Sequence, residues 1–73
     1  MIVERRYDPA NYDADTLGKS MQEAYELAEK DDIDYLRCAV EDVHFFAKES
    51  MKFREISPEE CRDIQDFFWG LLP

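Results

Sequence analysis

The pair Glu41 and His44 is the part of this sequence best suited to metal chemistry, because Glu-x-x-His spacing places both side chains on one side of a helix. In helical-bundle metalloproteins two such pairs, with carboxylates from other helices, hold a two-metal centre. A homodimer would bring the second pair, and Glu23, Glu26 or Glu29 would have to supply further carboxylates. A single Glu-x-x-His is common by chance. The dimeric metal site is therefore kept only as an alternative to two hypotheses that are based on protein contacts and are described below. No bound cofactor is expected.

Nucleophilic catalysis lacks most of its parts in this chain. His44 is the only histidine, and Cys38 or Cys61 would need its imidazole within hydrogen-bond reach, together with an orienting group and an oxyanion site. The only glycines, Gly18 and Gly70, are isolated, whereas phosphate-binding loops are rich in glycine. The sequence therefore predicts a protein without catalytic activity.

Acidic side chains outnumber basic ones by 18 to 9, which gives a net charge of −9. This charge opposes nucleic-acid binding, because affinity for phosphates comes mainly from Lys and Arg. The segment 8–34 holds nine acidic and two basic side chains. An acidic face is predicted there, which would either select a basic protein partner or imitate a phosphate backbone and inhibit a nucleic-acid-binding protein. Its residues are Glu23, Glu26, Glu29, Asp31 and Asp32.

A chain of 73 residues has room for one domain, so residues 1–73 are expected to fold as a unit. Hydrophobic residues make up 45% of the chain, which is enough apolar surface to form a core. No apolar run approaches the roughly 20 residues of a membrane span. Neither a signal peptide nor the dense cysteine spacing of a secreted scaffold is found. The sequence predicts a cytoplasmic protein that does not contact membranes.

Three helices are predicted to position these residues, because apolar side chains recur at steps of three and four in three segments. The segments span about residues 14–30, 33–52 and 58–71. Ahead of them, residues 1–7 form an extended arm or a short strand, and residues 8–13 form a loop. The fold class is therefore all-α, a small three-helix bundle with an extended N-terminal arm.

The starts of the helices are marked by capping residues. Asp13 or Asp15 is suited to cap the first helix, and Asp32 the second. The strongest start signal precedes the third helix, where Ser57 is followed by Pro58 and Glu60 completes a capping box.

The apolar stripes of the three helices predict the core. Tyr35, Ala39 and Phe46 widen the stripe of the second helix on one flank. Gly18 costs about 1 kcal/mol relative to alanine inside a helix, so the first turn either frays or lies against a close neighbour. The stripes consist of Ala14, Leu17, Met21, Ala24, Tyr25 and Ala28; of Ile33, Leu36, Val40, Val43 and Ala47; and of Cys61, Ile64, Phe67, Phe68 and Leu71.

Several aromatic side chains fall outside these stripes. Phe45 and Trp69 project away from them, and Phe53 and Tyr12 lie beyond the predicted core as well. Either the N-terminal arm and the connection 50–56 fold over these rings, or the rings anchor a protein partner, as Trp and Tyr often do.

The leading hypothesis is a non-catalytic protein-interaction module or regulator. Its anchors are Trp69, Phe45, Phe53 and Leu72, and its partner is a basic protein or a second copy of the chain.

Overall fold

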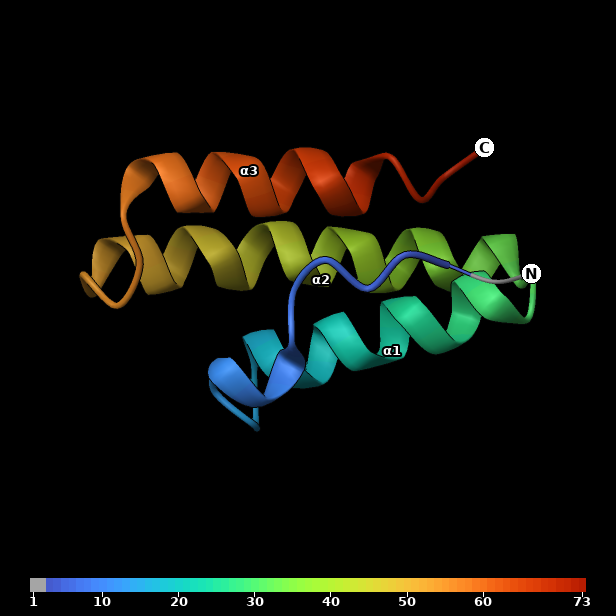
Figure 1. Ribbon diagram of the computed structural model, residues 1–73, viewed down its shortest axis with the longest axis horizontal. Coiled ribbons are helices and arrows are strands. Elements are labelled where there is room, and N and C mark those ends of the chain that lie inside the picture. The colour runs from blue at the N-terminus through green and yellow to red at the C-terminus, as the bar shows by residue number, and fades with distance from the viewer. Residues whose placement is uncertain (1–2) are drawn as a thin grey trace.

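Three α-helices and one short 3-10 helix form the regular structure of residues 3–73, which the computed structural model describes. Both α1 and α3 pack against α2, so the longest helix is also the central one (Figure 1). The predicted all-α three-helix bundle is confirmed. The elements are η1 (Pro9–Asn11), α1 (Leu17–Glu29), α2 (Ile33–Lys52) and α3 (Pro58–Trp69).

The first helix begins at Leu17, three residues after the predicted start. Asp13 instead organises a turn, because its backbone oxygen accepts the N–H of Gly18 at 2.8 Å and its carboxylate accepts the N–H of Asp15 at 2.8 Å. Ala14 lies in this turn and is exposed. Its predicted place in the apolar stripe of the first helix is therefore wrong. An aspartate that bonds to its own loop competes with the helix for the same backbone.

Gly18 is buried where this loop folds back on the first turn of α1. A Cβ atom at Gly18 would lie 2.6 Å from the carbonyl oxygen of Pro9 and 2.9 Å from that of Asp13. Of the two expectations for Gly18, the structure therefore shows the close neighbour rather than fraying.

The link between α1 and α2 contains Asp31, whose φ of 57° lies in the left-handed region. The N–H of Asp31 donates to Ala28 O at 3.2 Å, and the N–H of Asp32 donates to Leu27 O at 3.1 Å. This pair of bonds is the Schellman motif, which satisfies the last carbonyl groups of a helix. Asp32 occupies the predicted cap position of α2, but its side chain accepts no capping hydrogen bond.

The end of α2 repeats the same arrangement at Arg54, which has a φ of 61°. The N–H of Arg54 donates to Met51 O at 3.0 Å, and the N–H of Glu55 donates to Ser50 O at 2.9 Å. Both connections between helices therefore place a residue other than glycine in a left-handed conformation.

The cap predicted for α3 is formed, since Ser57 Oγ accepts the N–H of Glu60 at 3.0 Å. The helix ends at Trp69, two residues before the predicted end. Gly70 is its C-cap, and Leu71 and Leu72 continue in a tight turn that bonds back to Phe68 O and Trp69 O, both at 3.1 Å. The chain thus leaves the helix two residues early, because the N–H groups of Leu71 and Leu72 bond three residues back instead of four.

Apolar side chains of all three helices meet in one core, and they come almost entirely from the predicted stripes. Phe67 and Leu71 of α3 are only partly buried, and Ala39 of α2 is buried on the flank. The buried apolar residues are Leu17, Met21, Ala24, Tyr25, Ala28, Leu36, Ala39, Val40, Val43, Ala47, Cys61, Ile64 and Phe68.

The N-terminal arm crosses between α1 and α3 on one side of the bundle (Figure 1). Residues 3–7 form no strand, and Met1 and Ile2 of the predicted arm lie outside the described residues. The buried hydroxyl of Tyr25 donates to Tyr7 O at 2.8 Å and accepts the N–H of Tyr7 at 3.1 Å. One side chain of α1 thus satisfies both backbone groups of an arm residue.

Contacts with α3 hold the other side of the arm. The Tyr7 ring packs edge-on against Phe67 with centroids 5.7 Å apart, and its hydroxyl donates to Asp63. Two ion pairs flank this contact, Arg6 with Asp63 at 3.1 Å and Arg5 with Glu29 at 2.7 Å. The arm therefore ties α1 to α3 and covers Phe67 and Phe68, not Phe45 or Trp69.

Candidate interaction surface

Four large aromatic side chains remain exposed on the outside of the bundle. Phe53, Phe45 and Trp69 were predicted there, and they expose 76%, 59% and 56% of their surface. Tyr35 exposes 67%, although its place beside the apolar stripe of α2 predicted a contact with the core. The flank of a stripe is buried only where a neighbouring helix extends over it, which the sequence alone does not determine.

The predicted anchors do not form one patch. The ring of Phe45 lies edge-on to Phe46, with centroids 5.3 Å apart, whereas the ring of Trp69 lies edge-on to His44 at 5.5 Å. Phe53 is the C-cap residue that follows the last turn of α2. Most of the exposed aromatic surface therefore belongs to α2, and Trp69 lies apart at the end of α3.

Along α2 the exposed aromatics follow a regular spacing. Tyr35, Phe46 and Phe53 belong to a row with alternating steps of four and three residues, which places its members on one side of the helix. Ala39 in this row is buried, and the other members are exposed or half-buried. We call this row the α2 seam; it consists of Tyr35, Ala39, Asp42, Phe46, Glu49 and Phe53.

Leu72, the fourth predicted anchor, is half-buried and packs against the core. Together with Val3, Ile33 and Leu36 it lines an apolar hollow of about 350 Å³ near the C-terminus. In the described residues Leu72 thus contributes mainly to the packing of the fold.

The predicted acidic face is partly neutralised by its neighbours. Glu29 forms an ion pair with Arg5 at 2.7 Å, and Glu26 accepts a hydrogen bond from Gln22 at 3.0 Å. Glu23 is exposed. Asp31 is exposed at the left-handed position after α1, and half-buried Asp32 precedes α2. Lys19 of α1 and Lys30, its C-cap, are exposed as well, so the outer surface of that helix carries both signs of charge.

His44 connects α2 to α3. Its Nε2–H donates to Gln65 O at 3.2 Å, and Gln65 Nε2 donates to His44 O at 3.2 Å. Glu41 is exposed one turn away. Within residues 3–73 no three His, Cys, Asp or Glu side chains are grouped so that they could hold a metal ion. His44 Nε2 is thus engaged with the α3 backbone.

The two cysteines lie in different surroundings. Cys61 is buried, and burial raises the pKa of its thiol more than the nearby Lys48 lowers it. A thiol with a raised pKa is a poor nucleophile, because the thiolate is the reactive form. Cys38 is exposed on α2.

In the part of the chain that the structure describes, no helix is both long enough and apolar enough to cross a membrane. No known protein family, curated protein or solved structure matches this chain.

Proposed function

We propose that this chain is a small, non-catalytic protein-interaction module that binds a basic protein partner through the α2 seam and the adjacent Phe45. The observation that carries the proposal is the exposure of Tyr35 and Phe45 on α2 and of Phe53 at its C-cap, while the core-facing side of that helix packs against α1 and α3. Aromatic side chains are frequent anchors of protein interfaces. The core is closed without these rings, so they are available to a partner.

The spacing of the seam favours a helical partner. Steps of four and three residues are the pattern by which one helix lies along another. Phe46, Tyr35 and Phe53 would contact apolar side chains of that partner. The pair Phe45 and Phe46 lies near the middle of α2, where a partner helix would exclude water best.

The charges favour a basic partner. Asp42 and Glu49 lie between the aromatic residues of the seam, and the whole chain carries a net charge of −9. Opposite charge speeds the association of two proteins, and like charge opposes it. A basic helix is therefore a better partner than a second copy of this chain.

Photo-crosslinking tests the proposal in the cells from which the chain comes. Benzoylphenylalanine is placed at Phe45 or, as a matched control, at the exposed Glu23 of α1. We expect one basic protein to be crosslinked from position 45 and not from position 23. Titration calorimetry with that protein should show affinity reduced about tenfold or more in the variant Phe45→Ser with Phe53→Ser. The exposed control Lys19→Ser should change affinity less than about twofold.

Two outcomes contradict the proposal. Affinity that stays unchanged in the Phe45→Ser and Phe53→Ser variant, with its circular dichroism intact, removes the aromatic anchors from the interface. The second outcome is that position 45 crosslinks to another copy of the chain and light scattering gives a dimer mass that resists salt. The surface would then serve self-association and not a basic partner.

A further inference from the structure

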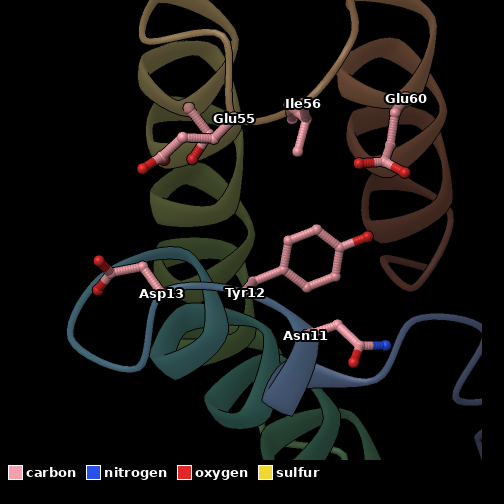
Figure 2. A pocket seen from close by; sticks show the side chains of 7 residues that line it. Asn11, Tyr12, Asp13, Glu55, Ile56 and Glu60 are labelled. Carbon is pink, nitrogen blue, oxygen red and sulfur yellow. The ribbon is translucent and has the colours of Figure 1, made fainter.

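At one end of the bundle, the loop before α1 and the connection between α2 and α3 border a hollow of about 490 Å³ (Figure 2). Every charged residue that lines it is acidic, and no Lys or Arg does. Its lining residues are Asn11, Tyr12, Asp13, Ser50, Glu55, Ile56 and Glu60. The sequence-predicted acidic face includes none of these residues.

Tyr12 projects into the space between the loop and the connection. Figure 2 shows its ring directed toward α3, with the carboxylate of Glu60 turned toward the hydroxyl end of the ring and with Asp13 and Glu55 on the other side. Glu60 belongs to the predicted capping box, and its backbone N–H binds Ser57 Oγ at 3.0 Å. Its carboxylate lines the hollow.

Ser50 supplies a second and independent observation. It exposes 8% of its surface, and its hydroxyl has no hydrogen-bond partner among residues 3–73. No buried side-chain polar atom of the described residues is both unpaired and cut off from solvent, so the Ser50 hydroxyl reaches an opening. Ser50 is one of the residues that line the acidic hollow. A nearly buried hydroxyl that bonds to nothing in the protein is able to bind a ligand there.

The shape and chemistry favour an organic cation over a metal ion. The described carboxylates are not grouped closely enough for one metal ion. A planar guanidinium is broader, and its several N–H groups can reach carboxylates on two sides of a site. A guanidinium also stacks on aromatic rings, and the half-buried ring of Tyr12 lines the hollow. Burial and the nearby Glu60 raise the pKa of the Tyr12 hydroxyl, so the ring stays uncharged at neutral pH.

We infer that this hollow binds the guanidinium group of an arginine side chain of the basic partner, with Asp13, Glu55 and Glu60 as its counter-charges. The inference rests on the proposed function for the source of the arginine. Phe53 of the α2 seam and Glu55 of the hollow are two residues apart in the same connection. A partner that lies along the seam therefore reaches the hollow where the seam ends.

The test uses a peptide of four arginines, a matched peptide of four lysines and free arginine amide, each titrated into the full chain and followed by amide NMR. We expect the arginine peptide to shift the amides of residues 11–13 and 55–60. The lysine peptide should bind several times more weakly, because ammonium groups neither stack nor form paired bonds. Free arginine amide should cause the same shifts at about tenfold higher concentration or more, since it gains nothing from neighbouring charges.

Matched variants separate a site from general attraction between opposite charges. The variant Glu55→Gln with Glu60→Gln should lose about fivefold or more of the affinity for the arginine peptide. The variant Glu23→Gln with Glu26→Gln changes the net charge equally on α1 and should lose less than about twofold. Ser50→Ala should weaken binding about threefold and should not lower the free energy of unfolding, because the hydroxyl has no partner in the protein and alanine favours the helix.

Equal losses in the two double variants, or shifts spread over α1, overturn the inference. If free arginine amide binds as tightly as the peptide, the inference that the guanidinium comes from a protein partner is wrong. The proposed function is judged separately with the crosslinked protein. If Phe45→Ser with Phe53→Ser loses that protein while Glu55→Gln with Glu60→Gln keeps it, the proposed function stands and the hollow is not its arginine site.

Discussion

Gly18 is held against backbone atoms rather than against flexible side chains. A methyl group there would lie 2.6 Å from Pro9 O and 2.9 Å from Asp13 O, so η1 and the following turn would have to move. The turn is itself fixed by Asp13, which bonds to Gly18 and Asp15. Glycine at this position therefore determines how the loop and the helix fit together.

Gly18→Ala should lower the free energy of unfolding by about 1–2 kcal/mol, because forced overpacking outweighs the gain of about 1 kcal/mol in helix propensity. Urea denaturation measures the change. Gly70→Ala is the control, since the nearest atoms there are 3.3 Å and 3.5 Å away and its φ is −66°. Gly18→Ala with stability equal to or above that of the parent chain would show that the loop yields easily.

Tyr25 anchors the arm with a hydroxyl that no solvent reaches. Tyr25→Phe leaves the N–H and the C=O of Tyr7 without this partner. The free energy of unfolding should fall by about 1–3 kcal/mol at neutral pH. Hydrogen exchange of the Tyr7 amide should accelerate more than that of the α2 amides, because the loss is local to the arm. Equal acceleration in both places would mean that the arm does not open separately.

Tyr25 also makes the free energy of unfolding depend on pH in the alkaline range. Burial raises the pKa of Tyr25 from its ordinary value of 10.0 to about 12, although the nearby Arg5 acts in the opposite direction. The phenol therefore ionises more easily in the unfolded chain, and its contribution to stability is full below about pH 10 and is lost as pH rises toward 12. Urea denaturation of the parent chain and of Tyr25→Phe between about pH 8 and 12 should show a gap that narrows above pH 10. A constant gap would contradict this assignment.

Both helix connections are built on left-handed residues that carry side chains. For an L-residue with a Cβ atom this conformation is less favourable by about 1–2 kcal/mol than the right-handed one. At Asp31 and Arg54 the Schellman hydrogen bonds of the helix ends offset that difference. Each connection is therefore held by its backbone bonds and not by the preference of its residue.

Asp31→Gly and Arg54→Gly should each raise the free energy of unfolding by about 0.5–1 kcal/mol, because glycine adopts this conformation without strain. Lys30→Gly is the matched control for Asp31→Gly. It has a right-handed φ of −85°, so glycine there should lower stability. Thermal unfolding of the three variants measures these changes in stability. A loss of stability in Asp31→Gly would show that the Asp31 side chain stabilises the fold by more than the backbone strain costs.

The whole molecule folds against a net charge of −9. Three ion pairs are found among residues 3–73, and all of them are partly exposed, so they compensate little of this repulsion. Salt screens repulsion between exposed charges over distances of about 10 Å. The melting temperature should therefore rise by a few degrees between about 20 mM and about 300 mM NaCl.

A variant with less repulsion provides the control for the salt effect. Glu23→Lys with Glu41→Lys changes two exposed residues on different helices and makes the net charge less negative. Its melting temperature at low salt should be higher than that of the parent chain, and its response to NaCl smaller. A melting temperature that falls with salt would mean that the surface ion pairs outweigh the repulsion.

Local patterns determined most of the fold. The bounds of α2 and the start of α3 follow from the apolar spacing around Val40 and from the Ser57 cap, since periodicity and capping involve residues within one or two turns. The exposure of Phe45 and Trp69 follows from the same spacing, because both lie off the stripes of their helices. The start of α1 was predicted too early, since the turn formed by Asp13 competes with the helix.

Contacts between distant segments were decided only by the tertiary structure. Neither the bonds of Tyr25 to the arm nor the carbonyl group beside Gly18 has a local signal, because each depends on how a loop folds back. Tyr35 stays exposed and Leu72 is half-buried for a similar reason, since the extent of a neighbouring element decides what a flanking residue meets. The acidic hollow exists because Tyr12, Ser50 and Glu60 reach the same end of the bundle. Spacing along a chain determines which side of a helix a residue occupies, whereas its neighbours depend on how the elements pack.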